Sequence, residues 1–222
     1  MYSELSTIEI PPQTTHSYSV IWLHGLGADG HDFEGIVPEL HLQAASSIHF
    51  IFPNAPVQPV TINGGMKMRA WYDILDMTLE RKVDSKGIYQ SSALINTLIE
   101  REMNKGISSE NILLAGFSQG GVIALHAGLR YPHKLAGIIA LSAYLPTLPQ
   151  LETERSTSNR DTPILMAHGI IDPVVAIESG KATFDALQAL DYPVEWHDYV
   201  MEHAVCQEEI EHISTFINNV FI

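Results

Sequence analysis

Short apolar runs rich in β-branched residues alternate with helical patterns along most of the chain. The runs that indicate strands are residues 18–23, 48–52, 111–115, 136–141, 163–167 and 194–200. Several are apolar throughout, as strands buried on both faces are. Apolar residues at helical spacing predict one helix from Ile88 to near Gly106 and another from Ile210 to Val220. This alternation predicts an α/β fold, with a mostly parallel twisted sheet covered by helices on both faces.

Length and charge narrow the functional classes. A chain of 222 residues fits a single domain over residues 1–222. Its 12 Lys and Arg against 26 Asp and Glu give a formal charge of −14, which disfavours nucleic acid and anionic lipid surfaces as partners. The longest apolar stretch, 135–145, is too short to span a bilayer, and the N-terminus lacks the pattern of a signal peptide. Cys206 is the only cysteine, which excludes an intrachain disulfide and favours the cytoplasm.

The motif Gly116-Phe117-Ser118-Gln119-Gly120 fits G-x-S-x-G and stands between a strand and a helical run. A sharp strand-to-helix turn strains the central serine, and only glycine two residues to either side avoids a clash. Ser118 is therefore the predicted nucleophile. The alternative is that Ser118 only caps the helix that follows.

A glycine-rich loop, His24-Gly25-Leu26-Gly27, follows the strand 18–23. In this position it supplies a backbone N–H to a developing oxyanion, so Leu26 and Gln119 are the predicted donors. Residues 25–30 also match G-x-G-x-x-G, which proposes a dinucleotide site. Such a site needs an acidic residue after the next strand, and that strand ends in Pro53 and Asn54, which argues against it.

The serine needs a base and an acid beyond the carboxyl ends of later strands. His203 lies between the last strand and the last helix, whereas His126, His197 and His212 fall within predicted elements. Asp172 follows the strand 163–167, and the order Ser, Asp, His is that of the α/β hydrolases. The predicted triad is Ser118, Asp172 and His203. His168 could support it or be a satisfied core histidine.

Two stretches break the alternation of strands and helices. Residues 53–84 combine prolines and Gly64-Gly65 with apolar side chains that have no helical period, which indicates a lid or pocket loop, or else an excursion packed on the core. Residues 145–162 are polar and predict a solvated surface loop. No recognised metal-ligand pattern is present, so neither a metal nor another cofactor is predicted.

These motifs together resemble the phospholipase/carboxylesterase family of small α/β hydrolases, which includes carboxylesterases, lysophospholipases and acyl-protein thioesterases. The resemblance covers almost the whole chain and rests on residues 20–30, 53–56, 71–73, 116–121, 168–169 and 172–175, and on His203 with Cys206. It implies the α/β-hydrolase fold and the same triad and oxyanion donors. It further implies a homodimer and an acyl pocket, whose predicted lining is Met66, Trp71, Ile74, Leu75 and Val174.

One position departs from the family pattern. Glycine usually precedes the catalytic histidine, and here Glu202 does. A carboxylate there favours the imidazolium form of His203. We therefore predict that Glu202→Gly moves the acidic limb of the activity profile to lower pH, and an unshifted limb would remove the hypothesis.

The sequence thus predicts a serine carboxylesterase that works through an acyl-enzyme on Ser118. Acyl-protein thioesterase and lysophospholipase activities remain open, because oxygen esters and thioesters use the same machinery. A non-catalytic protein that binds an acyl ligand is the alternative from another class.

Overall fold

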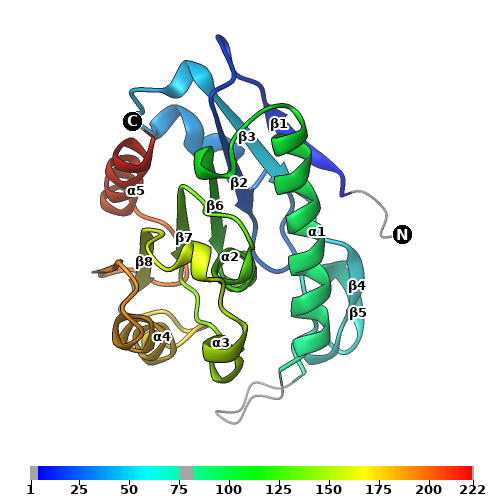
Figure 1. Ribbon diagram of the computed structural model, residues 1–222. Coiled ribbons are helices and arrows are strands. Elements are labelled where there is room, and N and C mark those ends of the chain that lie inside the picture. The colour runs from blue at the N-terminus through cyan, green and yellow to red at the C-terminus, as the bar shows by residue number, and fades with distance from the viewer. Residues whose placement is uncertain (1–4, 76–82, 222) are drawn as a thin grey trace.

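The structure, a computed structural model, describes residues 5–75 and 83–221 (Figure 1). Its main sheet has the strand order β1-β3-β2-β6-β7-β8-β9 within the described residues. The strands are β1 (Thr7–Ile10), β2 (Tyr18–Leu23), β3 (Ile48–Pro53), β6 (Ile112–Phe117), β7 (Gly137–Leu141), β8 (Ile164–Gly169) and β9 (Val194–Tyr199). All pairs are parallel except β1 with β3. The prediction of a mostly parallel α/β sheet is confirmed.

Helices cover both faces of this sheet because alternate strand residues point to opposite sides. Ile21 and Leu114 belong to the core that packs with α1 (Ser85–Asn104), α2 (Gln119–Arg130) and α4 (Ile177–Ala189). Trp22 and Leu113 belong to the core on the other face, with α5 (Gln207–Val220). Figure 1 shows α5 and α1 on opposite sides of the sheet.

Two stretches contain more regular structure than the sequence indicated. Within 53–84, the strands β4 (Val57–Val60) and β5 (Met66–Arg69) pair as an antiparallel hairpin. Its turn passes through Gly64 and Gly65, which adopt positive φ angles of 66° and 77°. Residues 76–82 of this predicted lid loop, Met77 among them, lie outside the described residues.

The prediction that 145–162 is a solvated loop is wrong in part. The helix α3 (Leu148–Glu154) lies within it, and Leu151 is fully buried. Asn159 is also fully buried, and its side chain accepts a hydrogen bond from the Leu135 N–H and donates to the carbonyl of Tyr131. The polar composition led to the prediction of a solvated loop. Polar residues such as Asn159 are nevertheless buried here, because their polar groups are hydrogen-bonded within the protein.

Candidate active site

Ser118 lies at the turn between β6 and α2, in a strained backbone conformation. Its φ of 54° and ψ of −120° are unfavourable for any residue with a side chain. A Cβ on Gly116 would lie 2.3 Å from the Gly120 carbonyl group, and one on Gly120 would lie 2.3 Å from the Leu23 oxygen. Both glycines are therefore required by contact with backbone, which gives the G-x-S-x-G pattern its physical cause.

Asp172 and His203 form a short hydrogen bond beyond the ends of two neighbouring strands. Asp172 follows β8 and His203 follows β9, and the His203 Nδ1–Asp172 Oδ2 distance is 2.6 Å. The other carboxylate oxygen of Asp172 accepts the N–H groups of Val174 and Val175, at 2.8 and 2.9 Å. Because an ionised carboxylate only accepts, Nδ1 of His203 carries the proton and Nε2 has the lone pair.

The base lies beside the sharp turn between β6 and α2 that carries Ser118, which we call the elbow. The His203 ring packs on Phe117, the residue before Ser118, with ring centroids 4.6 Å apart. Glu202, next to it in sequence, has an exposed side chain, so the effect of its charge on His203 remains a prediction.

The two predicted oxyanion donors flank the serine. Leu26 follows β2, the neighbour of β6, and Gln119 is the first residue of α2. Both line the same cavity as Ser118. Among the described residues, neither backbone N–H donates a hydrogen bond to the protein. Both amides are therefore available to a ligand, and the amide of Gln119 is also at the positive end of the α2 dipole.

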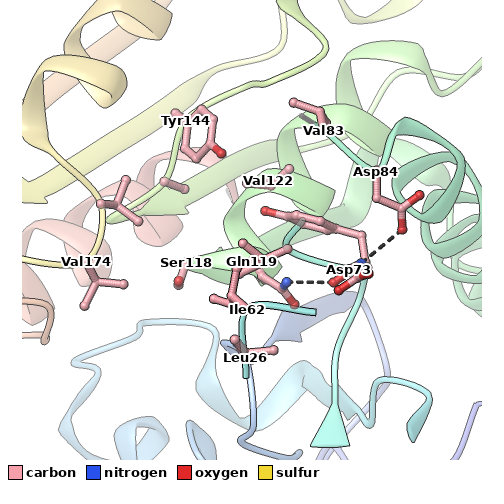
Figure 2. A pocket seen from close by; sticks show the side chains of 14 residues that line it. Leu26, Ile62, Asp73, Val83, Asp84, Ser118, Gln119, Val122, Tyr144 and Val174 are labelled. Atoms are coloured by element: carbon pink, nitrogen blue, oxygen red, sulfur yellow. Dashed lines mark hydrogen bonds between the residues drawn. The ribbon is translucent and has the colours of Figure 1, made fainter. Parts of the chain in front are cut away.

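The cavity beside Ser118 is mainly apolar (Figure 2). Its walls come from the glycine-rich loop, the hairpin region, the start of α1, the elbow and the loops after β7 and β8. The lining residues are Leu26, Ile62, Tyr72, Asp73, Ile74, Val83, Asp84, Ser118, Gln119, Val122, Ala143, Tyr144, Val174 and Val175. Ile74 and Val174 of the predicted pocket residues are among them.

Three predicted pocket residues do not line this cavity, and each has a physical reason. Trp71 is 1% exposed, and its indole N–H donates to the carbonyl of His24, so it packs in the core. Met66 is 65% exposed at the start of β5, and Leu75 is 39% exposed. The lining residues Ile62, Tyr72 and Val83 were missed because nothing in their spacing shows which way they face.

The side chain of Gln119 holds the cavity wall in place. Its Oε1 accepts the N–H of Trp71 at 3.0 Å, and its Nε2 donates to the carbonyl of Tyr72 at 2.9 Å. The two acidic lining residues have similar structural partners. Asp84 accepts the N–H groups of Asp73 and of Gly87 at the start of α1.

Other histidines and the cysteine have surroundings that do not suit a base for Ser118. His126 is buried in α2 against Thr147, and burial lowers its pKa to about 3, which is too low for a base near neutral pH. His168 is fully buried and donates to the carbonyl of Val175 from Nε2, which also lies 3.6 Å from Asp172 Oδ2, and burial is the main cause that lowers its pKa. Cys206 directly precedes α5, makes no side-chain capping hydrogen bond and is half-buried.

The structure gives a reason for the last glycine of the G-x-G-x-x-G match at residues 25–30 that needs no nucleotide. A Cβ on Gly30 would lie 2.5 Å from the carbonyl oxygen of Phe52, and its N–H donates to the side chain of Asn54. Gly30 thus packs on β3 and the residue after it, which accounts for its lack of a side chain.

A strand–serine–helix elbow with an acid after β8 and a base after β9 defines the α/β-hydrolase class. Comparison with known proteins narrows the class further. The chain belongs to the phospholipase/carboxylesterase family, whose model matches residues 6–221. It is a carboxylic ester hydrolase by that membership, and the predicted family and enzyme class are confirmed.

The similar proteins carry related names. Acyl-protein thioesterase 1 of Neurospora crassa is 41% identical over 217 residues, which cover 94% of this chain and 89% of that protein. The same-named protein of Schizosaccharomyces pombe is 39% identical, with 88% and 89% covered. Among solved structures, SOBER1 of Arabidopsis thaliana has a TM-score of 0.88 at 29% identity, with 93% and 100% covered. Acyl-protein thioesterase 2 of Zea mays has a TM-score of 0.87 at 28% identity, with 97% and 99% covered.

None of the helices in the described part of the chain combines the length and apolar character needed to cross a membrane.

Proposed function

We propose that the chain hydrolyses thioesters and oxygen esters of apolar acyl groups, with acylated proteins as its natural substrate class. The observation that carries this proposal is the short Asp172–His203 hydrogen bond beside the strained Ser118, at the mouth of an apolar cavity. The thioesterase names of the relatives support the acyl-protein part.

In the proposed mechanism, the lone pair on His203 Nε2 takes the proton of Ser118 as its oxygen attacks the acyl carbonyl. Asp172 holds the ring in this tautomer and stabilises the imidazolium that forms. The N–H groups of Leu26 and Gln119 bind the oxyanion. His203 then protonates the leaving thiolate or alkoxide, and water hydrolyses the acyl-enzyme through the same groups in reverse.

The apolar lining favours the acyl chain over a charged leaving group as the main recognition element. Its aliphatic residues, Leu26, Ile74 and Val174 among them, offer no charge to pair with a polar acid. The formal charge of −14 also disfavours a strongly anionic head group. We therefore propose acylated protein, rather than lysophospholipid, as the substrate class.

The test compares an S-palmitoyl peptide, a lysophospholipid and nitrophenyl esters of increasing chain length. Ser118→Ala should lose several orders of magnitude in turnover on all of them while it keeps its fold. The matched control is Ser46→Ala, at an exposed serine. Undiminished hydrolysis by Ser118→Ala would refute the assignment. Faster turnover of the lysophospholipid than of the peptide would transfer the proposal to that substrate.

Labelling with a fluorophosphonate separates the enzyme from a non-catalytic acyl-binding protein. Labelling should require Ser118 and be lost on heat denaturation. A protein that binds acyl chains without labelling would support the non-catalytic alternative.

We further propose a single catalytic domain that acts in the cytoplasm as a homodimer. The lone cysteine supports the compartment, and light scattering after gel filtration measures the oligomeric state.

A further inference from the structure

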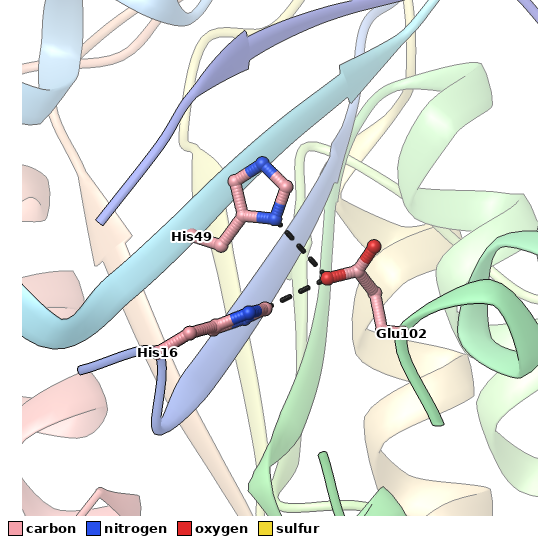
Figure 3. Close-up of side chains that lie close together, drawn as sticks. All are labelled: His16, His49 and Glu102. Carbon is pink, nitrogen blue, oxygen red and sulfur yellow. Dashed lines mark hydrogen bonds and ion pairs between the residues drawn. The ribbon is translucent and has the colours of Figure 1, made fainter. Parts of the chain in front are cut away.

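Three side chains that the proposed hydrolysis does not use converge at the opposite end of the sheet from Ser118. His16 precedes β2, His49 lies near the start of β3, and Glu102 lies in the last turn of α1 (Figure 3). One ligand atom from each lies within 4.8 Å of the others. The Glu102 side chain is fully buried, and those of His49 and His16 are 7% and 20% exposed.

Both rings place one nitrogen beside the same carboxylate oxygen of Glu102. His49 Nε2 lies 2.9 Å from a carboxylate oxygen of Glu9 and so carries a proton. Its Nδ1 then faces Glu102 Oε2 at 3.1 Å. The Nε2 of His16 lies 3.6 Å from the same oxygen, and the Ser19 hydroxyl between them lies 2.9 Å from this nitrogen and donates to Glu102 Oε2 at 3.1 Å. In the metal-free protein, protons of Ser19 and His49 hold these contacts to the carboxylate, and a divalent cation would take their place.

We propose that His16 Nε2, His49 Nδ1 and Glu102 Oε2 bind a divalent transition-metal ion, with Zn²⁺ as the best fit. Two imidazoles and one carboxylate are a donor set that zinc takes. Bonds of about 2.0–2.1 Å in a tetrahedron place the ligand atoms roughly 3.4 Å apart, and the two measured distances lie on either side of this value. The hydroxyl of Ser19, 2.9 Å from His16 Nε2, or a water molecule supplies the fourth position.

The surroundings of these ligands match those of protein metal sites. The carboxylate of Glu9 on the second nitrogen of His49 fixes the tautomer and raises the basicity of the ligand. Arg101 and Lys105 lie 3.1 and 2.7 Å from the other oxygen of Glu102, Oε1, so the carboxylate would bind the ion through Oε2 alone. These two cations also repel the metal, although the Lys105 side chain is 42% exposed and has room to move away. We therefore expect moderate affinity.

The position makes this a structural site. The ion would join the segment before β2, the sheet strand β3 and the C-terminal turn of α1, far along the chain from one another. Because the unfolded chain has no such site, binding free energy adds to folding stability. The hydrolytic triad lies at the other end of the parallel strands, so its activity is a separate readout.

The test uses the full chain, freed of metal by dialysis against a chelator and titrated with Zn²⁺ and Co²⁺. One zinc ion per chain should bind, and Tm should rise by roughly 5–10 °C at a free zinc concentration of a hundred times Kd. Co²⁺ should give the intense visible bands of a four-coordinate site. His16→Gln should lose all three signals, and this position, at 20% exposed, tolerates the change better than His49.

The matched control is His31→Gln, at an exposed histidine, which should keep the zinc response. Lys105→Gln should bind zinc more tightly because it removes a like charge, and weaker binding in this variant would count against an ion at this position. Zinc binding and a Tm rise that are equal in the wild type and His16→Gln would overturn the proposal. So would the absence of any Tm rise, which is the result expected if a proton on His49 takes the place of the metal.

Discussion

The substitution Asp172→Asn changes one atom of the candidate triad, and the structure determines how that atom must turn. Oδ1 of Asp172 accepts the N–H groups of Val174 and Val175, at 2.8 and 2.9 Å. An asparagine must keep its oxygen there, since an amide NH₂ cannot face two donors. Its NH₂ group therefore points at His203 Nδ1, which must become an acceptor. The proton moves to Nε2, the atom that has to receive the proton of Ser118.

The loss expected from this wrong tautomer is about 10⁴-fold in kcat, equivalent to about 5.5 kcal/mol of transition-state stabilisation. Stability should change little, because each hydrogen bond of the side chain keeps a partner. The assay is kcat on a short nitrophenyl ester, with Tm as the check on folding and ¹⁵N NMR to report the tautomer of His203. Asp161→Asn, in the loop before β8, is the control. A loss under tenfold, or a rise in KM with unchanged kcat, would refute the reasoning.

Three further substitutions test other parts of the structure. Gly120→Ala places a Cβ 2.3 Å from the Leu23 oxygen, so we expect a large drop in Tm and loss of turnover together; an active, stable variant would contradict the steric account of the elbow. Gln119→Leu leaves the Trp71 N–H without its acceptor and should lower stability by about 1–3 kcal/mol and raise KM, as measured by urea unfolding and by kinetics. Burial raises the pKa of Glu209 to about 8 from an unfolded value of 4.5. The contribution of protonated Glu209 to the free energy of unfolding is therefore fully present below pH 4.5 and is lost as pH rises to about 8. Glu209→Gln should therefore gain stability relative to the wild type between these pH values, by at most about 5 kcal/mol, and parallel pH profiles would refute this.

The central strands could be predicted because burial on both faces makes them apolar throughout. Ile112–Phe117 and Ile164–Gly169 are examples, and the predicted ranges lie within two residues of the observed ones. Strand β1 was missed because four residues, Thr7–Ile10, at an exposed edge have no such run. The hairpin of β4 and β5 was missed for a related reason, since Pro59 and two turn glycines obscure the period of two.

The candidate triad could be predicted because its positions depend on chain order and on the ends of strands, which a sequence displays. The pocket could not be predicted in the same way. Trp71 and Tyr72 are adjacent and both aromatic, yet only Tyr72 lines the cavity. The side chain of Gln119 fixes the backbone of both residues. The carbonyl of His24 then accepts the indole N–H of Trp71 and holds that ring in the core, away from the cavity. Such contacts join residues more than forty positions apart and have no local signal.

The geometry of Asp172 and His203 depends on residues with no part in the chemistry. His203 follows β9, an edge strand that pairs only with β8 among the strands described, and the N–H of Ile171 after β8 donates to the Met201 carbonyl after β9, so the contacts between these two segments place the base beside the acid. Gly169 makes this possible: a Cβ there would lie 2.4 Å from the carbonyl oxygens of Met201 and Glu202, and without one the acid and base loops pack against each other. A side chain at position 169 would push these loops apart and lengthen the 2.6 Å Asp172–His203 bond. The glycine after His168 therefore sets the distance on which the proposed proton transfer depends.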